Sequence, residues 1–105
     1  SISAHTGYKG LSMYASSKGA LQSFSKNISR EWGERGIRSN IVVPGYMETA
    51  MNAKLTQDHK NRIFKRTALK KETDMRSVAE TVLFLASEKS KSITGQEIFV
   101  DSGTL

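Results

Sequence analysis

Apolar residues recur at helical spacing early in the chain. From Met13 to Glu34 the large ones come every three or four residues, which places them on one face of a predicted helix. This stripe consists of Leu21, Phe24, Ile28 and Trp32. Such a stripe is more often part of a core than of a binding surface. Gly36 follows the helix at a position where glycine often ends one.

The second half of the chain contains two more helical patterns. A broad apolar face predicts a helix from Met75 to Ser87, and Asp74 is a suitable N-cap for it. That face contains Val78, Val82, Leu83, Leu85 and Ala86. The polar, basic segment before it predicts a loop and then a short amphipathic helix over Thr56 to Arg66, anchored by Ile63 and Phe64.

Two short apolar runs predict strands, over Arg38 to Val43 and over Gln96 to Asp101. The first run does not alternate between apolar and polar residues, which is typical of a sheet that is covered on both faces. Pro44-Gly45 ends it. The order helix, strand, helix, strand fits right-handed crossovers in a parallel sheet, so we expect an α/β fold.

Residues 1–13 are small and polar, and we expect a loop there, with Ser12 as the N-cap of the first helix. In the first turns of that helix, Tyr14 and Lys18 are four residues apart and share one face. An ammonium group beside a phenol favours the ionised phenol. Such a pair can donate and accept a proton in carbonyl and alcohol chemistry.

The chain has 105 residues, enough for one small domain, and carries a net charge of +6. That charge suits a nucleic acid, an acidic protein or a phosphorylated ligand, and it also suits a solvated basic surface. Phe64 is the only aromatic residue interleaved with the one basic cluster, whereas a single-strand binding groove would normally have more, so no nucleic acid is expected. The cluster consists of Lys60, Arg62, Lys65, Arg66, Lys70 and Lys71.

Cysteine is absent, so we expect neither a disulfide framework nor a thiolate metal site, and a cytoplasmic location is consistent with this. His5 and His59 have no partner at a ligand spacing, and we interpret both as surface residues rather than metal ligands. No apolar run approaches the ~20 residues of a membrane span, so we expect no membrane association.

The Tyr14…Lys18 pair has neighbours that resemble the short-chain dehydrogenase/reductase family. A serine, Ser1, precedes the tyrosine by thirteen residues, with Gly7 at the family's usual distance. The segment from Asn40 to Thr49 is similar to the family's strand and Pro-Gly loop. The family's C-terminal helix and last strand are matched by Val82–Ser87, Ile93–Gln96 and Val100-Asp101.

The resemblance implies a role for each matching residue. Tyr14 would be the general acid in reduction and the base in oxidation. Lys18 would stabilise the ionised tyrosine and hydrogen-bond the nicotinamide ribose. Ser1 would hydrogen-bond the substrate's carbonyl or hydroxyl, with Ser3 as the fallback. Two hydroxyl donors and a cation would then stabilise the charge that builds on the carbonyl oxygen.

The same resemblance implies a nicotinamide cofactor, NADP or NAD. It would be lined by Tyr14, Lys18, Pro44, Gly45, Met47 and Thr49. Three alternatives stay open for these residues: Tyr14 as an ordinary packed tyrosine, Ser1 as an ordinary loop serine and Thr49 as a helix cap. Met47 and Met51 could also serve only in packing.

Within the family the sequence looks most like the 3-oxoacyl-[acyl-carrier-protein] reductases. The segments that support this are Gly19-Ala20-Leu21, Phe24-Ser25-Lys26 and Arg35-Gly36-Ile37-Arg38. Arg35 falls where that branch places a basic residue for docking the acidic carrier protein. The implied reaction is hydride transfer between the cofactor and a carbonyl or alcohol, with a 3-oxoacyl thioester as the expected substrate.

The family's glycine-rich phosphate loop, its Asn-Ala-Gly segment and its catalytic asparagine all precede the position of Ser1, and none is among these residues. We therefore expect residues 1–105 to be the C-terminal, catalytic half of a single Rossmann-type domain with a doubly wound parallel sheet, without the dinucleotide-binding half. A homodimer or homotetramer is expected, since the family packs the first long helix against its symmetry mate. The alternative is a catalytically incomplete chain that acts only as an oligomerisation module.

Overall fold

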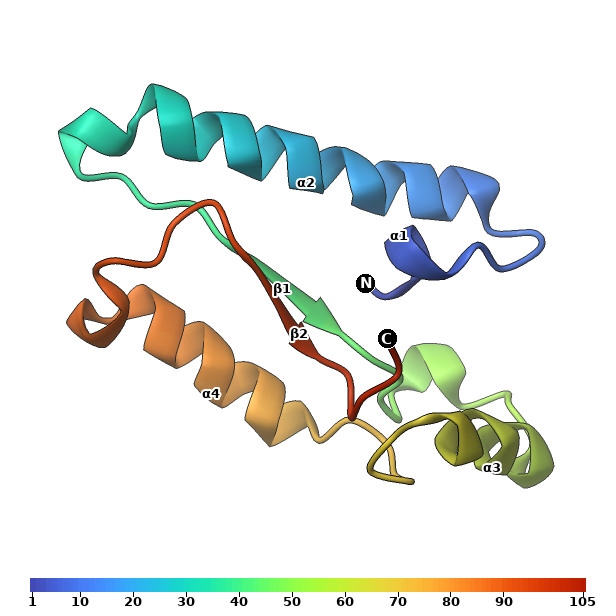
Figure 1. Ribbon diagram of the computed structural model, residues 1–105. Helices are drawn as coiled ribbons and strands as arrows, with labels where there is room; N and C mark the ends of the chain where they lie inside the picture. The colour runs from blue at the N-terminus through green and yellow to red at the C-terminus, as the bar shows by residue number, and fades with distance from the viewer.

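The computed structural model describes all residues from Ser1 to Leu105 and shows helices flanking a small sheet (Figure 1). The helices are α1 (Ser3–Thr6), α2 (Ser12–Glu31), α3 (Gln57–Arg66) and α4 (Met75–Ala86). The strands are β1 (Ile41–Pro44) and β2 (Glu97–Val100). Short 3₁₀ turns cover Gly33–Arg35, Ala50–Asn52 and Glu88–Ser90.

The two strands form a parallel sheet in which Ile41 pairs with Glu97 and Pro44 with Val100. Helix α2 lies on one side of the strands and α4 on the other (Figure 1). Helix α4 contacts both strands, and α2 contacts β1. The predicted α/β class, the parallel sheet and its cover on both faces are therefore confirmed.

Helix ends follow the predicted caps with one exception. The Asp74 carboxylate accepts hydrogen bonds from the backbone N–H groups of Arg76 and Ser77, at 3.2 Å each, and so caps α4 as predicted. The prediction of Ser12 as the cap of α2 is wrong. Leu11 occupies that position, and its carbonyl already accepts the N–H of Ala15 at 2.7 Å, so the helix begins one residue earlier than the polar side chain suggested.

The N-terminal segment is more ordered than predicted, and the first long helix is shorter. The expected loop over residues 1–13 contains one helical turn, α1, which ends at Gly7 with φ +66°. Helix α2 ends at Glu31 rather than Glu34, and a 3₁₀ turn carries the chain to Gly36, whose φ of +78° is the predicted left-handed conformation. Four residues are too few to produce a recognisable period, which is why α1 escaped prediction.

The side of α2 that faces the sheet is made of small polar residues. Ser25 and Ser29 are its buried residues, and the Ser25 hydroxyl bonds that of Ser39 at 2.7 Å. A Cβ on Gly95 would lie 2.7 Å from the Ser29 hydroxyl, so glycine allows the loop before β2 to approach the helix. The buried face of this helix is thus narrow and close-packed.

Most of the apolar stripe of α2 is exposed within this chain. Leu21 is 52% exposed and Phe24 65% exposed, so they are not core residues here, whereas Ile28 is partly buried. Leu83 of α4 is also 66% exposed, and Val43 is the one fully buried apolar residue. The accessible surface, 7635 Å², exceeds the roughly 5,800 Å² expected for a self-contained domain of this mass. The chain therefore leaves two apolar helix faces uncovered.

Candidate active site

All seven residues predicted to form the site line a single cleft of about 800 Å³. The cleft is bounded by the α1–α2 region, the end of β1 with the loop that follows it, and α3. The predicted residues among its lining are Ser1, Tyr14, Lys18, Pro44, Gly45, Met47 and Thr49. The fold thus brings together three stretches of sequence that the resemblance linked only by analogy.

Tyr14 and Lys18 lie in the first two turns of α2, and the Lys18 ammonium is 5.4 Å from the centroid of the Tyr14 ring. Tyr14 is 41% exposed, so it is not the ordinary packed tyrosine of the alternative interpretation. Lys18 forms no ion pair within the chain, whose three ion pairs involve His5, Lys60 and Arg76. Its charge is therefore available to the phenol and to a ligand.

Ser1 is held beside the end of β1. The N–H of Ile2 donates to the Pro44 carbonyl at 3.3 Å, and the Ser1 hydroxyl accepts the N–H of Ser3 at 3.2 Å. Ser1 and Lys18 both line the cleft.

The Pro-Gly loop is fixed by close packing against the end of β2. The Gly45 N–H donates to the Val100 carbonyl at 2.9 Å. A Cβ on Gly45 would lie 2.5 Å from the Thr73 hydroxyl oxygen and 2.7 Å from the Asp101 Cα, both too close for any real side chain. This position needs glycine for packing, whatever it contributes to the cleft.

Asn52 holds the loop after Gly45 in place through hydrogen bonds, a role that the sequence did not indicate. Its amide nitrogen donates to the Met47 carbonyl at 2.7 Å and reaches the Thr49 hydroxyl at 3.5 Å. The Met47 N–H makes no hydrogen bond within the chain. Thr49 occupies the N-cap position of the Ala50–Asn52 turn, but its hydroxyl caps no backbone group. The Met47 N–H and the O–H donor of Thr49 are therefore available to a ligand.

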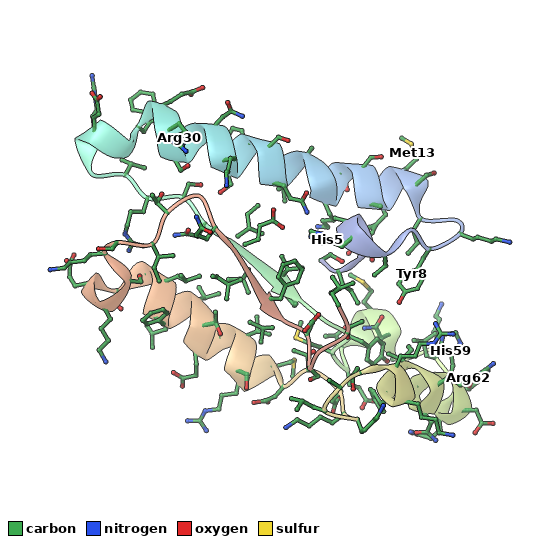
Figure 2. All side chains as sticks on the ribbon, viewed as in Figure 1. His5, Tyr8, Met13, Arg30, His59 and Arg62 are labelled. Atoms are coloured by element: carbon green, nitrogen blue, oxygen red, sulfur yellow. The ribbon has the colours of Figure 1, made fainter.

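His5 is exposed, as predicted, but it contacts residues that are distant in the sequence. Its Nε2 lies 3.2 Å from a Glu97 carboxylate oxygen and 2.7 Å from the Gln22 amide, and its ring meets Phe99 edge-on at 5.0 Å. These partners are distant in sequence, so no local spacing could reveal them. His59 is exposed as predicted, yet it lines the cleft on α3, where it faces the loop carrying Tyr8 (Figure 2).

Two further basic residues, Lys60 and Arg35, do not line the cleft. Lys60 is buried and pairs with Glu48, and the hydrogen bond to that carboxylate raises the pKa of Lys60. This pair ties α3 to the loop after β1. Arg35 lies outside the cleft, in the 3₁₀ turn after α2, with its guanidinium 5.4 Å from the Trp32 ring.

No helix of this chain is both long and apolar enough to cross a membrane.

Comparison with known proteins gives matches over the whole chain. A family model described as enoyl-(acyl carrier protein) reductase matches residues 1–104. Carbonyl reductase [NADPH] 2 of Sus scrofa is 36% identical over all of this chain and 44% of its own length. A 3-oxoacyl-[acyl-carrier-protein] reductase of Chlamydia trachomatis is 38% identical over 98% of this chain and 42% of its own length.

Solved structures also match this chain over almost its whole length. A candidate gluconate dehydrogenase from Agrobacterium tumefaciens superimposes with a TM-score of 0.94 at 28% identity, and a blue fluorescent protein from a metagenomic library, in complex with NADPH, with 0.90 at 32%. Each comparison covers 99% of this chain and 42% of the other. The chain thus spans less than half the length of the relatives that it matches. The family model, the relatives and the shared fold together show that the chain belongs to the short-chain dehydrogenase/reductase family.

Proposed function

We propose that this chain supplies the catalytic and substrate side of an NAD(P)(H)-dependent oxidoreductase that interconverts a carbonyl and an alcohol. The observation that carries the proposal is the single cleft shared by Ser1, Tyr14, Lys18 and the Pro44-Gly45 loop. A cation beside a phenol, a second hydroxyl and a loop with free donors form the set that carbonyl reduction requires.

In this mechanism the Tyr14 hydroxyl gives its proton to the carbonyl oxygen during reduction and takes it back during oxidation. Lys18, with its ammonium 5.4 Å from the Tyr14 ring centroid, stabilises the tyrosinate that remains after proton transfer. The Ser1 hydroxyl donates a hydrogen bond to the same substrate oxygen. Each group acts more strongly in the transition state than on the ground-state carbonyl, because negative charge builds on that oxygen.

The cleft residues fit the nicotinamide end of the cofactor. The free N–H of Met47 and the O–H donor of Thr49 suit a carboxamide, and Lys18 suits ribose hydroxyls. When bound, the cofactor supplies or accepts the hydride. We propose NADPH rather than NADH, since one relative is named for NADPH and one similar structure is a complex with NADPH.

The substrate that we propose is a 3-oxoacyl thioester, in keeping with the similarity to 3-oxoacyl-[acyl-carrier-protein] reductases and thus with fatty acid biosynthesis in the cytoplasm. Arg35 is exposed at the far end of α2 from Tyr14, which suits the docking of an acidic carrier protein. The test is NADPH oxidation on addition of acetoacetyl thioester to the protein that carries this chain. Reduction is expected, and no reduction of any ketone with either cofactor would contradict the proposal.

We further propose that residues 1–105 form the C-terminal part of one Rossmann-type domain and that the protein is a homodimer or homotetramer. The exposed apolar faces of α2 and α4 support this, because isolated helices rarely leave such faces in water. They also favour the second candidate, a chain that acts only in assembly. Sedimentation of the 105-residue chain tests it: a folded monomer would exclude assembly as its function.

A further inference from the structure

Helix α3 presents a basic face to the cleft that the sequence analysis did not identify. His59, Ile63 and Arg66 are spaced by four and three residues, so they share one face of the helix, and all three line the cleft. In Figure 2, His59 lies on the side of α3 toward Tyr8, which lines the opposite wall. The face thus alternates basic, apolar and basic side chains along the cleft.

The basic residues of α3 fall into two groups, those that line the cleft and those that do not. Lys60 is neutralised by Glu48, while Arg62 and Lys65 lie outside the cleft. The side chains of His59 and Arg66 form no ion pair or hydrogen bond within the chain. The two basic groups that face the cleft are therefore the ones left without an internal partner.

The charge of the cleft is one-sided. Lys18 and Arg66 carry its charge, and no aspartate or glutamate lines it, although the chain holds 10 acidic residues. Most of the remaining lining is apolar, including Met51 and Ile63. Apolar walls lower the effective dielectric constant and strengthen the attraction of a fixed cation for an anion. Arginine adds a planar donor fork that matches carboxylates and phosphates.

We infer that the substrate carries a negatively charged group, a carboxylate or a phosphate, which binds Arg66 and His59 while its carbonyl lies at Tyr14. This inference rests on the proposed function and names its substrate class. The aliphatic part of the substrate then packs against Ile63 and Met51. Charge-assisted hydrogen bonds from Arg66 hold the anion, so substrate charge governs KM rather than the chemical step.

Two matched substrate pairs test this in the protein that carries the chain. The carboxylate pair is 4-oxopentanoate and its methyl ester; the phosphate pair is the acetoacetyl thioesters of 4′-phosphopantetheine and of pantetheine. We expect the charged member of at least one pair to have a kcat/KM higher by roughly tenfold to a hundredfold, the range of a hydrogen bond to a charged group. The preferred pair identifies the anion. Arg66→Gln should remove the preference through KM and leave the neutral member unchanged.

Arg62→Gln is the matched control, because it removes the same charge from the same helix outside the cleft. An equal loss in both variants would overturn the inference, since net charge would then explain it. A rise in KM for NADPH with Arg66→Gln, without a change for the ketones, would also overturn it, because the cation would serve the cofactor. Equal kcat/KM values of the wild type for the two members of each pair would also overturn the inference.

If the wild-type protein reduces none of the four compounds, the proposed function fails, and binding decides the inference separately. Isothermal titration calorimetry with 4-oxopentanoate and the acetoacetyl thioester of 4′-phosphopantetheine then compares the wild type with Arg66→Gln. Binding of either anion that is lost in the variant supports the anion site. No binding to the wild type, or equal binding to both proteins, overturns it.

Discussion

Replacing Gly45 with alanine should destabilise the fold, because the new methyl group has no room. It would lie 2.5 Å from the Thr73 hydroxyl oxygen and 2.7 Å from the Asp101 Cα. The Thr73 side chain could rotate, but the Asp101 contact is with backbone and cannot be relieved by a rotamer change. The loop must therefore move away from β2, which stretches the hydrogen bond from the Gly45 N–H to Val100, now 2.9 Å long.

The cost has two parts. Overpacking a close-packed site typically costs about 1–3 kcal/mol. A lost backbone hydrogen bond adds about 1 kcal/mol. We therefore expect Gly45→Ala to lower the free energy of unfolding by roughly 2–4 kcal/mol, which for a protein of the relatives' length lowers the Tm by about 4–16 °C. Urea denaturation should show a lower midpoint with an unchanged m-value.

Gly19→Ala is the matched control, since nothing lies within 4 Å of a Cβ at that position in α2. It should leave stability unchanged or raise it by up to ~1 kcal/mol, because alanine is the better helix former. Adding Thr73→Ala to Gly45→Ala should restore only part of the loss. The reasoning is refuted if Gly45→Ala unfolds at the wild-type urea concentration, or if Thr73→Ala restores full stability.

Two further predictions concern the cap of α4 and the far end of α2. Hydrogen bonds from the Ser77 hydroxyl and the Arg76 N–H lower the pKa of Asp74, so its stabilisation is present above the unfolded pKa of ~3.9 and is lost as the pH falls through the folded value. Asp74→Ala should therefore lower the urea midpoint more at pH 7 than at pH 2.5, and an equal loss at both would exclude the carboxylate charge as the cause. Arg35→Glu should raise KM for a carrier-protein thioester about tenfold, or ~1.4 kcal/mol, but not for a pantetheine thioester; equal KM values for wild type and variant on the carrier-protein substrate would remove Arg35 from docking.

The fold could be predicted from the sequence where local chemistry decides it. Asp74 caps α4, and Gly36 takes the left-handed conformation that ends the turn after α2, because these preferences act over a few residues. The orientation of the apolar stripe could not be predicted. Periodicity shows that Leu21 and Phe24 share a face, but which face is buried depends on partners elsewhere, and here Ser25 and Ser29 fill that place.

The proximity of the candidate site residues was predictable where a motif spans them. Tyr14, Lys18 and the Pro44-Gly45 loop were identified together, and the structure places them in one cleft. The reason for glycine at Gly45 was not predictable, because Thr73 and Asp101 approach it from distant parts of the sequence. The basic face of α3 was missed for the same reason: its helical spacing is visible in the sequence, but its position beside the cleft is not.

Tyr14→Phe tests the central claim, that Tyr14 is the proton donor of a carbonyl reductase. The phenyl ring keeps the packing in α2 and the position of Lys18, and only the hydroxyl is lost. In the protein that carries this chain, kcat/KM for acetoacetyl thioester should fall roughly 10²–10⁴-fold, the usual contribution of a general acid. NADPH affinity, measured in parallel by fluorescence, should weaken no more than about tenfold, the worth of one hydrogen bond. Reduction at the wild-type rate would contradict the account.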